Sequence, residues 1–344
     1  HDARHCLRHC LYTCCIGHNN NHVLMSHILV KVLKDWTLPI SMLMGSVCYV
    51  VFTRCAWALP VKPYIVSFIP YLLPALIFLM LFLSYCKIDP KELRPRPWHL
   101  ILVLIQLAET LLAVWWCIHH HDSEWLPLAE SLLAVFVAPM AAVGAVVTQK
   151  IGGNPATATT YTVVSSLFTA IMVPSVYPLV EPGIGVSFLA LFCKILSRVF
   201  PTIIFPLFLA LFLRRYAPRV HQWVCAEAKD KSFYLWAVCT MVNTAQIIRC
   251  IVNSEGAMNI IWSIVLIVGM VVCLQFYIGK HIGARYGDRI AAGQGLAQKN
   301  TVLSIWIAMT FLSPTAAIGP GVCLLWQNIV NSWQIYTAAH RSSR

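Results

Sequence analysis

The segment 291–312, AAGQGLAQKNTVLSIWIAMTFL, joins a polar, glycine-containing half to an apolar half of membrane-spanning character. Lys299 lies where the two halves meet. A continuous transmembrane helix through this segment would place the ammonium group in lipid, at a cost of about 2.5–3.5 kcal/mol. That cost is avoided where the helix is interrupted and its polar residues face protein or a water-filled cavity. The segment therefore predicts a broken helix, with the break at Gly293 and Gly295 and the rest of the chain enclosing the polar residues.

The composition is that of a polytopic membrane protein. Hydrophobic residues make up 59% of the 344 residues and charged residues only 11%, whereas a soluble domain carries about 25% charged residues. The net charge of +12 is typical of basic loops that fix orientation and touch the lipid bilayer, so we expect no nucleic acid partner. The sequence contains no P-loop, GxSxG or HExxH motif, and we do not expect an enzyme.

Ten apolar segments predict an all-α integral membrane protein with ten transmembrane helices. They cover residues 37–55, 64–86, 98–117, 125–148, 158–180, 185–213, 233–252, 257–278, 290–312 and 317–337. Basic residues gather in alternate loops, which by the positive-inside rule places both termini in the cytoplasm and loop 119–124 outside. The histidines and acids of that outer loop are compatible with a metal site, but we interpret the segment as a solvated loop.

The two halves of the chain carry interruptions at corresponding positions. Pro139 lies in the fourth segment and the glycine pair in the ninth, so each break falls in the fourth of five helices. Matching interruptions are typical of secondary transporters built from inverted repeats. The pattern predicts a first five-helix repeat over residues 25–183 and a second, inverted one over 184–344. Residues 1–24 hold five His and four Cys; a metal-binding tract is one interpretation, and we favour a disordered or non-native extension.

Three collinear stretches resemble the bile acid:sodium symporter family. They are GNPATATTYTVVSSLFTAIMVP from Gly153, LFLALFLRRYAPRV from Leu207, and KNTVLSIWIAMTFLSPTAAIGPGVCLLWQN from Lys299. The resemblance implies ten helices in two parts. A core domain would hold spans three to five and eight to ten, and a panel domain the other four. It also implies that substrate binds between the two parts, where the broken helices cross.

The family's sodium ligands are mostly missing at the matching positions. The third-span Gln is kept as Gln106 and the fifth-span Thr as Thr162. The other ligand positions hold Gly144, Ala145, Ala158, Gly295 and Lys299. Because a hard cation needs several oxygen ligands, we do not expect sodium to be used in the family's manner. Proton coupling stays open, since a buried lysine titrates readily.

Several polar residues near the expected crossing are candidates for substrate or ion binding. Lys299 can replace the sodium charge or titrate, or it can simply extend to the cytoplasmic rim. Glu109, three residues after Gln106, is a candidate partner for Lys299 unless it faces another polar neighbour. The remaining candidates supply amides and a hydroxyl for an anionic substrate, or else join helices by hydrogen bonds. They are Gln294, Gln298, Asn300, Thr301 and Asn328.

These features predict a secondary active transporter that moves an organic anion or similar small solute by alternating access. The alternative is a membrane binding or sensory module that keeps the transporter fold without transport.

Overall fold

The structure is a computed structural model that describes residues 37–57, 60–181, 187–253 and 258–342. In those ranges the chain folds into helices, together with one isolated β-bridge. The predicted all-α class is therefore confirmed. The extension 1–24 lies outside the described residues.

Five helices of the described chain are long and apolar enough to cross a membrane. They are α3 (Lys62–Cys86), α4 (Pro97–His119), α7 (Pro155–Val180), the run Phe188–Tyr216 and α11 (Met258–Ala284). Shorter apolar stretches lie in α2 (Thr37–Arg54), α5 (Leu126–Phe136), α10 (Pro218–Asn253) and α13 (Thr301–Phe311). Large apolar side chains such as Leu43, Trp262 and Met270 are exposed, while Gln106 and Lys299 are buried. This inside-out distribution suits a protein surrounded by lipid.

Two of the predicted segments are interrupted helices. The fourth consists of α5 and α6 (Val143–Lys150), and the ninth of α12 (Arg289–Ala297) and α13. The break near Pro139 lies where the sequence predicts it, over residues 137–142. The other prediction was wrong in position: Gly293 and Gly295 belong to α12, and the chain leaves the helix only at 298–300.

Glycines in this region serve close helix packing instead of breaking a helix. A Cβ atom on Gly293 would lie 2.6 Å from Cγ of Lys280, on α11. A Cβ atom on Gly279 of α11 would lie 2.5 Å from the carbonyl oxygen of Ala292, on α12. The two helices therefore approach each other more closely than larger residues would allow.

Other helix ends also differ from the sequence-based bounds. The sixth segment is divided at Ile204 into α8 (Phe188–Ile203) and α9 (Phe205–Tyr216), with Pro201 and Pro206 on either side of the division. Helix α10 begins at Pro218 instead of near 233. The chain ends in α14 (Ile318–Ser342), which follows the short turn η2 (Pro314–Ala317). Proline at the start of a helix costs no hydrogen bond, so Pro206 and Pro218 mark the beginnings of α9 and α10.

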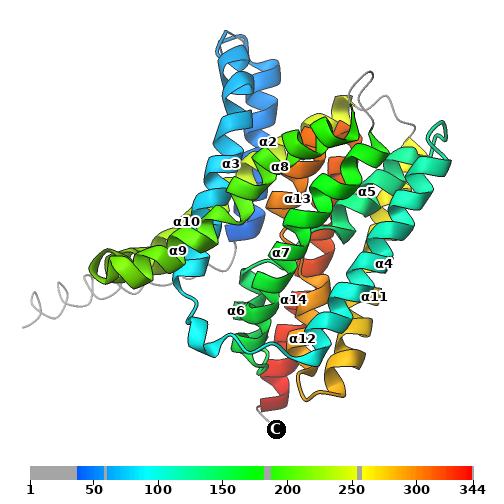
Figure 1. The fold of residues 1–344 in the computed structure, drawn as a ribbon. Helices are drawn as coiled ribbons and strands as arrows, with labels where there is room; N and C mark the ends of the chain where they lie inside the picture. Colours follow the sequence, from blue (N-terminus) through cyan, green and yellow to red (C-terminus); the bar gives the residue numbers. More distant parts are fainter. Residues whose placement is uncertain (1–36, 58–59, 182–186, 254–257, 343–344) are drawn as a thin grey trace, which may run out of the picture.

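The helices pack in two groups. Helices α4 to α7 and α11 to α14 surround the two breaks, whereas α2, α3, α9 and α10 contact mainly one another. Figure 1 shows α2 and α3, in blue, as a hairpin standing beside the larger group. Helix α8 follows α7 in the chain and contacts both α7 and α3, so it connects the two groups.

Candidate functional site

The two breaks cross and pair with each other through backbone hydrogen bonds. Met140 and Lys299 form an antiparallel β-bridge. The N–H of Ala141 donates to the carbonyl of Gln298 at 2.8 Å, and the N–H of Asn300 donates to the carbonyl of Pro139 at 2.8 Å. Backbone groups that lose their helical partners inside a membrane protein must find others. Here the free backbone groups of each break hydrogen-bond to the other break. These bonds hold the two broken helices together where they cross.

Side chains from the surrounding helices satisfy the remaining carbonyls at the end of α5. Gln106 on α4 donates through Nε2 to the carbonyls of Phe136 (2.8 Å) and Ala138 (2.9 Å). Thr169 on α7 donates to Val137 at 2.7 Å. The structure thus places the predicted Gln106 at the crossing, where it supports the break.

Lys299 is buried at the crossing, with 2% of its surface exposed. The amide of Gln327 on α14 holds its backbone from both sides, accepting from the N–H at 3.0 Å and donating to the carbonyl at 3.3 Å. Among the described residues, no side chain hydrogen-bonds or ion-pairs with the Lys299 ammonium group at contact distance. The interpretation of Lys299 as a residue that reaches the cytoplasmic rim is therefore wrong, because the side chain stays inside.

Glu109 does not form the direct ion pair considered from the sequence. Its carboxylate accepts a hydrogen bond of 2.7 Å from Nε2 of Gln275 on α11. It is the acidic group that acts electrostatically on Lys299, but at more than contact distance. The alternative from the sequence, a different polar neighbour for Glu109, describes what the structure shows.

A buried amide cluster lies beside Lys299. Asn331 on α14 accepts from Nε2 of Gln294 at 2.8 Å and donates to Oε1 of Gln298 at 2.5 Å. The Oε1 atom of Gln294 has no hydrogen-bond partner in the described structure. The cluster brings the predicted Gln294 and Gln298 together around a residue that the sequence reasoning missed.

Four other predicted residues make no side-chain hydrogen bond to the amide cluster. Asn300 caps α13, accepting from the N–H of Leu303 at 3.3 Å, and Thr301 is buried directly after it. Thr162 donates to the carbonyl of Ala158 in its own helix at 3.2 Å. Asn328 is partly buried and donates to Leu324 in its own helix at 2.6 Å, so its assignment to the site stays a prediction. The buried polar side chains of α14 are those of Gln327, Asn331 and Gln334.

The chain matches a known protein family over most of its length. A family model described as "SBF-like CPA transporter family" matches residues 41–339. The chain belongs to this transporter family. The resemblance to bile acid:sodium symporters is thereby confirmed, and the family and the apolar helices support a multi-pass membrane protein. Family membership points to a transporter of the SBF type instead of an enzyme. No curated protein matches the chain.

In this SBF-like family member, apolar groups lie beside several residues that the resemblance aligns with the family's sodium ligands. A Cβ atom on Gly144 would lie 2.5 Å from the Cε methyl of Met140. A Cβ atom on Gly295 would lie 3.0 Å from the ring of Tyr161, with Leu102 and Trp98 just beyond it. These rings belong to one buried apolar cluster that also includes Ala158. The site has no room for a glutamate at Gly295 unless the aromatic rings move.

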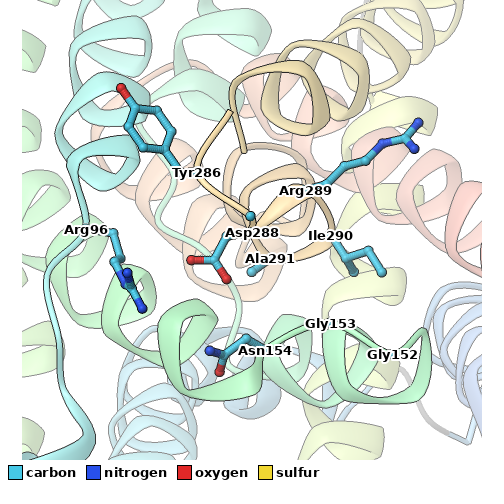
Figure 2. A pocket seen from close by; sticks show the side chains of 10 residues that line it. Arg96, Gly152, Gly153, Asn154, Tyr286, Asp288, Arg289, Ile290 and Ala291 are labelled. Atoms are coloured by element: carbon cyan, nitrogen blue, oxygen red, sulfur yellow. The ribbon is translucent and has the colours of Figure 1, made fainter. Parts of the chain in front are cut away.

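The SBF-like chain also carries a cavity of about 550 Å³ at one end of the larger helix group (Figure 2). Its lining includes Arg96, Asn154 and Arg289. Asp288 projects into the same region, and its carboxylate accepts from the Trp98 ring N–H at 3.0 Å and from the Thr157 hydroxyl at 3.2 Å. Asp288 therefore ties the starts of α4 and α7 to the start of α12. The cavity shares no lining residue with the crossing.

Proposed function

We propose that the protein is a secondary active transporter that moves an organic anion or similar small solute by alternating access. The observation that carries the proposal is the pair of hydrogen-bonded helix breaks with a buried lysine between them. Discontinuous helices that meet inside a membrane protein are the usual site of substrate and ion binding in secondary transporters. The proposed movement is a rocking of the α2, α3, α9 and α10 group against the helices around the crossing.

The two breaks support an architecture of ten spans in two inverted repeats. Each break lies in the fourth apolar segment of its half, and the broken segments pair in an antiparallel sense at Met140 and Lys299. A five-helix unit repeated once must insert the second copy upside down, because five is an odd number. Ten spans also agree with the proposed cytoplasmic location of both termini.

The charge at the crossing favours an anionic solute. Lys299 places a buried amine there without a contact ion pair among the described residues, and this amine supplies a positive charge when it is protonated. Helices α6 and α13 both begin next to the breaks, and helix N-termini carry partial positive charge. An anion at the crossing would be stabilised by all three.

The filled ligand positions support transport without the family's sodium sites. Gly144, Ala158 and Gly295 offer no side-chain oxygen, and methyl and aromatic groups occupy the adjoining space. When it is protonated, Lys299 adds a positive charge where the resemblance places a Gln ligand. A sodium ion would have to displace these groups as well as find new ligands.

One feature favours the alternative of a binding or sensory module without transport. The amides of Gln294, Gln298 and Asn331 bond to one another, so they already use much of their hydrogen-bonding capacity. A rigid network of this kind is compatible with a site that binds a solute but does not open alternately to the two sides of the membrane.

Solute counterflow distinguishes these functions. Purified protein is reconstituted in liposomes that are loaded with an unlabelled anion, using a bile acid and a short carboxylate as two separate probes. A transporter accumulates the labelled probe transiently and saturably against its gradient, and protein-free liposomes do not. Saturable binding without counterflow would contradict transport and favour the sensory module, and flux that rises linearly with concentration would indicate a channel.

A further inference from the structure

A second cavity lies in the smaller helix group, away from the crossing. Helices α2 and α3 both pack against α10 but have little contact with each other. A cavity of about 600 Å³ remains between them, with α10 as its floor. Its volume is within the range of small-molecule binding sites, about 300–1,000 Å³. It shares no lining residue with the crossing or with the cavity beside Asp288, so it is a separate candidate site.

Most of this cavity is apolar and elongated. On each of the three helices the lining residues recur at the spacing of a single helix face. Lys62 begins α3 and Leu72 lies almost three turns further along the same helix, so the lining of α3 extends over about 15 Å. The apolar lining includes Phe52, Val66, Ile69, Leu72, Met241 and Val242. A space of this shape and lining fits a hydrocarbon chain.

One end of the cavity is basic. Lys62 and Arg249 both line it, and none of its lining residues is acidic. Within the described residues, no carboxylate oxygen lies within 4.0 Å of either basic group. The loop charges predict that this end faces outside, where the positive-inside rule gives no reason for lysine or arginine. The two cations therefore call for another explanation, and an anionic ligand provides one.

A buried amide lies next to these cations. Gln246 precedes Arg249 by less than one turn of α10, lines the cavity and has only 6% of its surface exposed. Its side chain makes no hydrogen bond to any other described residue. Buried amides nearly always have a hydrogen-bond partner, because burial without one is costly. An oxygen atom of a ligand in the cavity would supply the acceptor that the protein does not.

We propose that this cavity binds a single-chain amphipathic carboxylate, such as a fatty acid. The carboxylate lies between Lys62, Arg249 and the amide of Gln246, and the hydrocarbon chain extends between α2 and α3 over α10. Two cations and an amide donor match one carboxylate group, because a carboxylate accepts several hydrogen bonds and carries the complementary charge.

This site is distinct from the solute site proposed at the crossing. It lies within the group of α2, α3 and α10, whereas the crossing is formed by the broken helices of the other group. Binding here therefore does not depend on whether the protein transports a solute, and the two proposals can be tested separately.

Photoaffinity labelling of the full chain in phosphatidylcholine nanodiscs tests the site. The probe is laurate with a photoreactive diazirine near the end of its chain, and mass spectrometry should find the label on α2, α3 and α10. Unlabelled laurate should prevent labelling, and dodecanol, which has the same chain without the charge, should compete about tenfold less well.

Variants at the polar end identify the groups that bind the carboxylate. Arg249→Gln should weaken laurate competition by about tenfold, the loss expected for one charge-assisted hydrogen bond. Gln246→Leu should also weaken it, although this change makes the cavity more apolar. Arg54→Gln is the matched control, because Arg54 is an exposed cation at the end of α2 that does not line the cavity. It should leave the competition unchanged.

Several results would overturn the fatty-acid site. Dodecanol that competes as well as laurate would show a purely apolar cavity, and this comparison in the wild type decides the matter even if Arg249→Gln does not fold. Loss of labelling in nanodiscs that contain phosphatidylglycerol would identify a bilayer phospholipid as the occupant. Label confined to α12 and α13 would place the probe at the crossing. Labelling in this cavity by a protein that shows no counterflow would refute the proposed transport function and leave the fatty-acid site valid.

Discussion

Lys299 contributes to the crossing through its backbone and to the proposed function through its side chain. Gln327 holds the Lys299 N–H and carbonyl, so the fold of the crossing does not depend on the ammonium group. A buried charge without a direct partner reduces the free energy of unfolding. Stability and function therefore make opposite demands on this side chain.

Replacement of Lys299 allows its effects on stability and on anion binding to be measured separately. Lys299→Met should keep or raise the melting temperature, because it removes the cost of a buried charge. The same variant should weaken anion affinity at least tenfold, which corresponds to about 1.4 kcal/mol. Thermal unfolding and ligand titration on one protein preparation measure both effects. Lys150→Gln, at the exposed end of α6, is the control and should change neither. A lower melting temperature with unchanged affinity would show that Lys299 is structural.

At the scale of elements, the helices could be predicted from the sequence, but the contacts between them could not. Apolar length gave the helical segments, and Pro139 located the first break. The second break lies at 298–300 because pairing with a distant segment fixes it there, and no local signal at Gly293 or Gly295 reports that pairing. The resemblance to the family motif made Asn328 a candidate for the binding site. Helical spacing instead places Gln327, Asn331 and Gln334 on one face, and that signal could have found them.

The two neighbouring residues of α14 provide a matched test of the crossing. Gln327→Leu removes two buried hydrogen bonds to the Lys299 backbone, and the N–H keeps only the carbonyl of Ala297 at 3.1 Å as its acceptor. At about 0.5–1.5 kcal/mol for each hydrogen bond, the loss is about 1–3 kcal/mol. We expect a corresponding loss in the free energy of unfolding. Asn328→Leu, one position along, removes only a hydrogen bond within its own helix and should cost much less. Equal losses in the two variants, measured by denaturant unfolding in detergent, would be inconsistent with this role of Gln327.

At the scale of the whole molecule, orientation in the membrane determines from which side each cluster is reached. The basic loops predict that Asp122 lies outside and Arg219 inside, and both residues are exposed in the structure. In a background free of reactive cysteines, Asp122→Cys should react with an impermeant thiol reagent added to intact cells. Arg219→Cys should react only after the cells are opened. The reverse pattern would invert the topology.

The central proposal is an SBF-type transporter that works without the family's sodium sites. The most direct test is to measure uptake of a labelled organic anion in sodium buffer and in choline buffer, each across a range of pH. Saturable uptake should persist in choline with a rate within about twofold of that in sodium, because Gly144, Ala158 and Gly295 supply no ligand oxygens and apolar groups fill the space beside them. The rate should change with pH. Uptake that requires sodium and does not depend on pH would contradict this proposal, since the ion would then bind at the crossing despite the missing side chains.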